Sequence, residues 1–232
     1  MRPSRSRVNR AGELLRAHRT GRRRLDSHDY LREQAVVEAF RARHGAALTR
    51  VAANLRYYVE SEADGGAWSV GQRLKAMPTI LDKLVREPKM ELGRMHDVGG
   101  CRGVLPDQDA VDRVIVRLQR RWQLRDHMWD YVSAPKPDGY RAKHLCAIKD
   151  GVLIEVQLRT TTQHTWAELV ERFDREHRLE LKAGRADADT RRLFAEISEL
   201  LHLQERGALT DVEFVERVTA LADPDTGTRS RR

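Results

Sequence analysis

The chain has 232 residues, of which 40% are hydrophobic and 34% charged, so it can bury one core under a well-hydrated surface. Its formal net charge of +8 favours an anionic partner, such as a nucleotide, a nucleic acid or an acidic membrane surface. No apolar run approaches the ~20 residues of a membrane-spanning helix and no apolar leader follows Met1, so we expect a cytoplasmic protein without a membrane partner.

Arginines dominate the start of the chain, and Glu13 is the only acid among them. We interpret residues 1–26 as a basic, partly disordered segment. The alternative is an electrostatic clamp for RNA phosphates that includes Arg22, Arg23 and Arg24.

A long helical pattern runs from residue 29 to about residue 61, and Asp64-Gly65-Gly66 ends it. A short strand at 67–74 then leads to a helix near 79–86, which Pro88 stops.

The middle of the chain alternates strand patterns with one helical pattern. We expect strands at 98–105, 123–132, 144–148 and 152–159, and a helix at 109–121. The turn residues Lys149-Asp150-Gly151 join the last two strands into a hairpin. Cys101 and Cys146 lie in these apolar runs, which indicates reduced core cysteines rather than a disulfide or a metal site.

Three helical patterns follow, at 162–181, 189–206 and 211–221, before a polar end at 223–232. The whole pattern predicts an α+β fold, with a mixed sheet of about five strands flanked by helices and helical extensions at both ends. We divide the chain into the basic segment 1–26, one domain at 27–206 and a short extension at 207–232.

The strand at 152–159 carries the strongest chemical signal. Because strand side chains alternate, Glu155, Gln157 and Arg159 share one face, opposite Ile154 and Val156. Such a polar row is costly inside a fold unless it is paired or binds a ligand. A solvated face of an antiparallel hairpin is the alternative explanation.

Two further groups of residues are of the type that binds phosphate and metal. Asp97 precedes the strand that Arg102 interrupts, and Mg²⁺ prefers one or two carboxylates plus substrate phosphates. Arg73, Lys75 and Lys83 surround a strand-to-helix junction, where backbone N–H groups also attract anions. A turn carboxylate and ordinary surface cations are the alternatives.

The loop before the hairpin places a tyrosine between cations. Lys136 and Arg141 bracket Tyr140 beside Gly139, and a ring in such a loop can stack on a nucleobase, worth ~1–3 kcal/mol. An ordinary surface turn is the alternative, and His144 alone is typical of a hydrogen-bonded core histidine.

These residues fall in the order of four motifs of the RelA/SpoT alarmone synthetases, which the chain resembles over roughly residues 73–168. The matching positions are Arg73, Lys75, Thr79, Ile80 and Lys83; Asp97, Gly100 and Arg102; Asp130, Tyr131, Pro135, Lys136, Gly139, Tyr140 and His144; and Glu155, Gln157, Arg159, Thr160 and His164 with Ala167 and Glu168.

The resemblance implies a nucleotidyltransferase-like fold and transfer of the β,γ-pyrophosphate of ATP to the ribose 3′-hydroxyl of GDP or GTP, making (p)ppGpp. The implied ATP-binding residues are Arg73, Lys75, Lys83 and Arg102. Asp97 and Glu155 would hold Mg²⁺ and be the catalytic residues, and Glu155 would also draw the proton from the hydroxyl.

The resemblance also implies an acceptor-binding set: Tyr140, Lys136, Gly139, Arg141, His144 and Gln157. Tyr140 would stack on the acceptor base, with Lys136 and His144 near its phosphates. The dipeptide His28-Asp29 occurs in the hydrolase domain of long family members, but such a metal site needs upstream histidines and a domain of its own, and here an Arg-rich segment precedes the dipeptide. We interpret it as a helix start.

The chain is similar to the small, single-domain members of the family, and it departs from their pattern at Asp138 and at Ala142-Lys143. Because some small members are toxins that modify the 3′-CCA end of tRNA or make adenosine alarmones, a tRNA acceptor is an alternative. Lys143 and the helix around Trp166 favour that branch. A non-catalytic RNA-binding protein on the same fold is a further alternative, and an antitoxin partner and an oligomer are left open.

Overall fold

The computed structural model describes residues 3–177 and 186–222, and its centre is a five-stranded mixed sheet. The strands lie in the order β1 (Ser69–Leu74), β2 (Gly99–Leu105), β5 (Val152–Thr160), β4 (Lys143–Lys149) and β3 (Trp129–Asp130). β2 and β5 are parallel, and the other neighbours are antiparallel. The predicted α+β fold with about five strands is confirmed.

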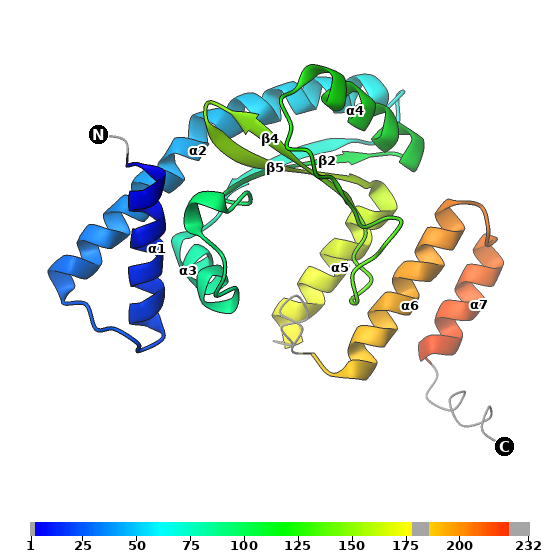
Figure 1. The fold of residues 1–232 in the computed structure, drawn as a ribbon. Helices are drawn as coiled ribbons and strands as arrows, with labels where there is room; N and C mark the ends of the chain where they lie inside the picture. The colour runs from blue at the N-terminus through cyan, green and yellow to red at the C-terminus, as the bar shows by residue number, and fades with distance from the viewer. Residues whose placement is uncertain (1–2, 178–185, 223–232) are drawn as a thin grey trace.

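Helices cover both sides of this sheet (Figure 1). The α-helices are α1 (Arg5–Arg19), α2 (Ser27–Glu62), α3 (Met77–Arg86), α4 (Gln108–Arg121), α5 (Thr161–His177), α6 (Ala188–Glu205) and α7 (Asp211–Ala222). α2 and α4 lie over one face, whereas α3 and α5 lie on the opposite side and α6 and α7 follow α5 in a row. None of the described helices is both long and apolar enough to cross a membrane.

The main core lies between the sheet and α2. Val152, Ile154, Val156 and Leu158 alternate along β5 and are buried with residues of α2 and α4. Their burial follows from the period of two that the sequence shows, since every second side chain of a strand meets the same layer. The polar residues between them therefore lie on the other face.

A tight turn sets the register of the β4–β5 hairpin. Asp150 and Gly151 have φ angles of 51° and 72°, the left-handed conformation that two-residue hairpin turns need. Lys149 consequently pairs with Val152, and the same register places His144 opposite Gln157.

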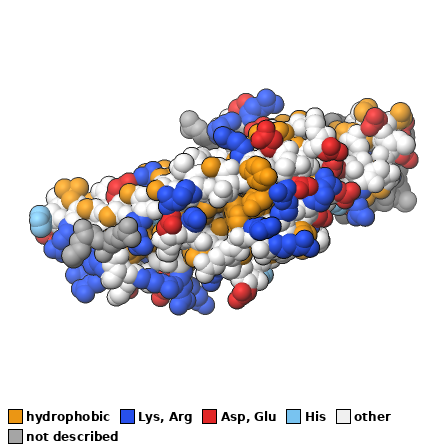
Figure 2. Space-filling model, turned by 90° about the horizontal axis from the view of Figure 1, so that it is seen from above, with side chains coloured by type: hydrophobic (Ala, Val, Ile, Leu, Met, Phe, Trp, Pro, Cys, Tyr) orange, Lys and Arg blue, Asp and Glu red, His pale blue; other side chains and the backbone are white. Residues whose placement is uncertain are grey.

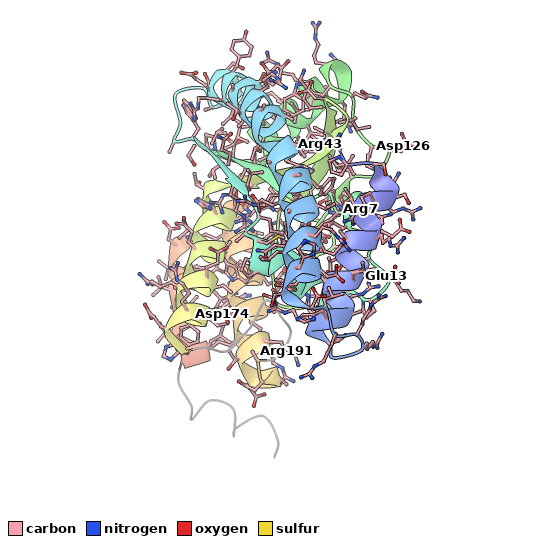
Figure 3. All side chains as sticks on the ribbon, turned by 90° about the vertical axis from the view of Figure 1, so that its left-hand side faces the viewer. Arg7, Glu13, Arg43, Asp126, Asp174 and Arg191 are labelled. Atoms are coloured by element: carbon pink, nitrogen blue, oxygen red, sulfur yellow. The ribbon has the colours of Figure 1, made fainter. Side chains whose placement is uncertain are left out.

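The basic start of the chain is a packed helix, so the expectation of a partly disordered segment was wrong. Val8, Ala11 and Leu15 recur at helical spacing on α1 and are buried against α2 and α3. Figure 3 shows α1 lying along α2, with Arg7 labelled on it. Arg7 forms an ion pair with the buried Glu33 of α2, which fixes the contact.

The predicted strand at 123–132 was also wrong over most of its length. Only Trp129 and Asp130 form β3, and Leu124 adds a single bridge to β4. The Asp130 carboxylate accepts hydrogen bonds from the N–H groups of Val132 and Ser133, which turns the chain and ends the strand. The other predicted elements agree with the structure within a few residues. The expected end of the α5 helix at 181 and the polar end at 223–232 lie outside the described residues.

Leu15→Ala tests whether α1 belongs to the fold. Leu15 is 1% exposed, and removal of such a buried side chain costs about 2–5 kcal/mol. We expect the free energy of unfolding in urea to fall by that amount, whereas the exposed Arg10→Ala should leave it nearly unchanged. Equal denaturation midpoints for the two variants would show that α1 adds nothing to stability.

Candidate active site

The sheet face opposite α2 and α4 carries most of the predicted site residues. Arg102 pairs with Gln157 between β2 and β5, and Gln157 pairs with His144 between β5 and β4. His144 in turn stands opposite Trp129 on β3. Directly opposed residues project from the same face, so one row of polar and aromatic side chains crosses four strands.

A neighbouring row holds Arg73 and Glu155 on either side of a glycine. Arg73 stands opposite Gly100, and Gly100 stands opposite Glu155. Gly71 faces Arg102 in the same way, and a side chain added at Gly71 would meet nothing within 4 Å. The two arginines therefore flank a patch of sheet without side chains, where a flat group can approach the backbone.

Asp97 is the anionic centre of the second group. Its Oδ2 accepts hydrogen bonds from Lys75 Nζ at 2.7 Å and from Lys83 Nζ at 3.0 Å. Burial opposes ionisation, but the charges and hydrogen bonds of the two lysines lower the pKa of Asp97 to about 2. Asp97 Oδ1 is buried and has no hydrogen-bond partner among the described residues.

Glu155 is held by three neighbouring side chains. His144 Nδ1 lies 3.2 Å from Glu155 Oε1, and Gln157 Nε2 donates to Oε2 at 2.7 Å. His96 Nε2 is 4.0 Å from Oε1. Burial would raise the pKa of Glu155, but His144 and the hydrogen bond of Gln157 hold it at about 2, against the repulsion of Asp97. Glu155 is therefore a permanent anion at neutral pH.

A chain of polar contacts joins Glu155 to the predicted acceptor loop. Tyr140 Oη lies 2.8 Å from His144 Nε2 and accepts a hydrogen bond from Arg159 Nη2 at 2.8 Å. Lys136 Nζ is 4.6 Å from the ring centroids of both Tyr131 and Tyr140. This places Tyr140, Lys136 and His144 together beside the carboxylate.

Two residues of the predicted acceptor set, Arg141 and Gly139, attach the loop to α6. The buried Arg141 donates to Val132 O at 2.7 Å and forms an ion pair with Glu199. Gly139 has a φ of 87°, and its carbonyl accepts a hydrogen bond from the Ser198 hydroxyl at 2.5 Å. A side chain at Gly139 would come within 2.8 Å of α6, so the loop depends on this glycine.

His96 and Trp129 lie beside the site and were missed by the motif comparison, whereas Tyr131 was a matched position without an assigned role. His96 stacks on Trp129 with ring centroids 5.1 Å apart and an interplanar angle of 17°. Tyr131 contacts Tyr140 and His144 edge to face. His96 and Trp129 directly precede the motif residues Asp97 and Asp130, so sequence adjacency was the signal available.

The carboxylate oxygens of Asp97 and Glu155 are ligands that fit a hard divalent cation. Asp97 offers an unpartnered buried oxygen, and the charge of Asp97 acts on Glu155, so two carboxylates that repel each other share one region. Within the described part of the chain, three ligand atoms lie close together only at Asp26, His28 and Asp29. There the Asp26 carboxylate caps α2, in line with our interpretation of His28-Asp29 as a helix start.

Comparison with known proteins points to one family. Residues 72–177 match the family model described as "Region found in RelA / SpoT proteins". A probable GTP diphosphokinase of the Arabidopsis thaliana chloroplast is 29% identical over 101 residues, which are 43% of this chain and 14% of that protein. GTP pyrophosphokinase YwaC of Bacillus subtilis is 30% identical over 111 residues, which are 42% of this chain and 53% of that protein. The matched part thus spans about half or less of each relative.

The fold is shared with a solved enzyme structure. Small alarmone synthetase 1 from Bacillus subtilis, bound to its product pppGpp, matches with a TM-score of 0.64 at 22% identity. The match covers 79% of this chain and 98% of that chain.

Asp97→Asn tests the electrostatics of the site in EDTA-containing buffer. The pKa of Asp97 is lowered from 3.8 to about 2 on folding, so its ionised form stabilises the fold above about pH 4 and this contribution disappears towards pH 2. We expect the free energy of unfolding of the wild type to exceed that of Asp97→Asn, and this difference should be about 2 kcal/mol larger at neutral pH than near pH 2. Urea unfolding across a pH series measures this difference. Asp126→Asn, at an exposed position, is the control. A stability difference between wild type and Asp97→Asn that does not change with pH would contradict the ionised state assigned to Asp97.

Proposed function

Because residues 72–177 match the region found in RelA/SpoT proteins, we propose that the protein is an ATP-dependent pyrophosphokinase that makes (p)ppGpp from GDP or GTP. The observation that carries the proposal is the site around Asp97. Two lysines and an unpartnered buried oxygen of Asp97 lie near a second ionised carboxylate, Glu155. This arrangement suits a magnesium-bound polyphosphate.

ATP binds, in this proposal, on the β1–β2 side of the sheet. The adenine ring lies between Arg73 and Arg102, over the backbone of Gly71 and Gly100, because guanidinium groups stack on flat aromatic rings. Lys75 and Lys83 exchange part of their contact with Asp97 for contact with the phosphates. Asp97 and Glu155 hold Mg²⁺, which when bound neutralises charge on the transferred phosphates.

The acceptor nucleotide binds on the β4 side, beside Tyr140. The base stacks on the face of the Tyr140 ring over which Lys136 Nζ now lies. The Lys136 side chain turns away from the ring and binds the acceptor phosphates. The Tyr140 hydroxyl stays fixed by His144 and Arg159, so the ring keeps its orientation. Gln157 holds Glu155 in place through its 2.7 Å hydrogen bond.

The transfer forms one bond and breaks one. The acceptor 3′-oxygen bonds to the β-phosphorus of ATP, the bond between that phosphorus and the α,β-bridging oxygen breaks, and AMP leaves with the bridging oxygen. Glu155 accepts the hydrogen bond of the 3′-hydroxyl and receives its proton, which passes to solvent. Because the pKa of Glu155 is about 2, its resting role is to orient the hydroxyl, and the proton leaves late in the reaction.

The structure supports a mononucleotide acceptor over tRNA. Lys143, which suggested tRNA, forms an ion pair with Asp112 on the α4 side of the sheet. Trp166, the second such residue, is buried and donates to Phe194 O at 3.1 Å. Both residues have roles in the fold, while the exposed Arg22, Arg23 and Arg24 keep the tRNA alternative testable.

Glu155→Gln should lower the transfer rate by roughly 10²–10⁴-fold or more, because it removes a charge and a proton acceptor while keeping the shape. The assay is the formation of labelled product from γ-labelled ATP with GDP or GTP. The matched control is Glu60→Gln, the same substitution at an exposed position near the end of α2, which should leave turnover unchanged. Near-wild-type turnover of Glu155→Gln with unaltered Mg²⁺ dependence would disprove the assignment.

The triple variant with Arg22, Arg23 and Arg24 changed to Ala identifies the acceptor. With a mononucleotide acceptor its turnover should match wild type, because these arginines lie in the α1–α2 connection. With tRNA as acceptor, each lost phosphate contact should reduce the slope of log K against log salt by about 0.7–0.9. Labelling of GDP, GTP, AMP and deacylated tRNA across a salt series measures both the turnover with each acceptor and its dependence on salt. Labelled tRNA without labelled guanine nucleotide would overturn our first choice.

A further inference from the structure

A cavity of about 500 Å³ lies on the opposite face of the sheet from Glu155. It is bounded by the second half of α2, the end of α4 and the end of β4. Lys149 in its lining stands opposite Val152, a core residue on the α2 side of the sheet, so the sheet separates this cavity from the candidate active site. The volume falls in the range of roughly 300–1,000 Å³ that small-molecule sites occupy.

Two aromatic rings form one wall of the cavity. The rings of Tyr58 and Trp122 have centroids 6.2 Å apart and are tilted by 59°. Both are half-buried: the Arg117 guanidinium lies 4.7 Å from the Tyr58 ring, and the backbone N–H of Trp122 donates to Leu118 O at 2.8 Å, which fixes the backbone of Trp122 at the end of α4. Two neighbouring rings that are only partly buried offer a surface against which a planar group can lie.

The lining carries two cations, Arg121 and Lys149, and one acid, Asp150. Within the part of the chain that the structure describes, Arg121 and Lys149 form no ion pair, although both line the cavity. Asp150 is the acid of the lining, and it is paired with Arg50. An anionic group of a ligand would therefore meet two cations without displacing an internal partner.

Two amides complete the lining. Asn54 and Gln123 have exposed side chains, and each offers both donors and an acceptor. The backbone carbonyl of Gln123 accepts a hydrogen bond from the backbone N–H of Ile148 at 2.8 Å, which fixes this segment to β4. Such groups match the mixed donor and acceptor edge of a purine.

We propose that this cavity binds a free purine nucleoside monophosphate, with the base against Tyr58 and Trp122 and the phosphate at Arg121 and Lys149. An uncharged nucleoside would use only the rings and amides, and inorganic phosphate would use only the cations. A nucleotide uses all three kinds of group, so it should bind more tightly than either fragment.

The test follows the indole N–H signal of Trp122 by NMR in the full chain, assigned with Trp122→Phe, during titration with GMP. We expect a saturable shift at lower concentration than with guanosine or with inorganic phosphate. The double variant Arg121→Gln/Lys149→Gln should bind about tenfold more weakly or worse by this signal. The control Arg56→Gln/Arg120→Gln removes two exposed cations outside the lining and should bind like wild type.

Binding at the candidate active site gives a different result. Trp129 stands on the other sheet face, stacked on His96, so GMP bound there shifts Trp129 and leaves Trp122 unchanged. That outcome, or equal GMP affinity of the two double variants at Trp122, would overturn the proposal. The Trp122 signal is independent of turnover, so loss of the pyrophosphokinase activity and loss of this site are distinguishable.

Discussion

The structure depends on the fact that β5 must present two different chemistries on its two faces. Its apolar residues fill the core under α2, and the residues between them are Glu155, Gln157 and Arg159. A register slip of one residue would bury this polar row and expose the core. The Asp150-Gly151 turn and the parallel pairing with β2 fix β5 on both sides, so the geometry of the site follows from the packing of the core.

The fold keeps two neighbouring carboxylates ionised by different means. Asp97 relies on the full charges of Lys75 and Lys83, whereas Glu155 relies on His144 and on the amide of Gln157. The contacts of Asp97 with the two lysines are therefore strong but exchangeable, because the lysine side chains can turn to bind phosphate. The Glu155 contacts come from the sheet itself and hold that carboxylate in one orientation.

Much of this arrangement could be predicted from the sequence because it is local. The alternation along β5, the Asp150-Gly151 turn and the polar residues at strand ends are visible within a few residues of one another. The packing of α1 was missed because the arginines outweighed its short stripe of Val8, Ala11 and Leu15.

Contacts between distant parts of the chain were the ones that sequence reasoning could not supply. Arg141 lies in a loop that matches a ligand-binding motif, but its partner Glu199 comes from a helix 58 residues later. The stacking of His96 on Trp129 likewise joins two segments that no local pattern connects.

The 36-residue helix α2 contributes side chains to two separate apolar clusters, and this has a thermodynamic consequence. Its first half, with Val37 and Phe40, packs with α1 and α3, and its second half, with Leu48 and Leu55, packs under the sheet. A continuous rod of roughly 54 Å therefore makes the two clusters parts of one cooperative unfolding unit. Lys83 on α3 and Glu155 on β5 therefore keep a fixed spacing until the whole domain unfolds.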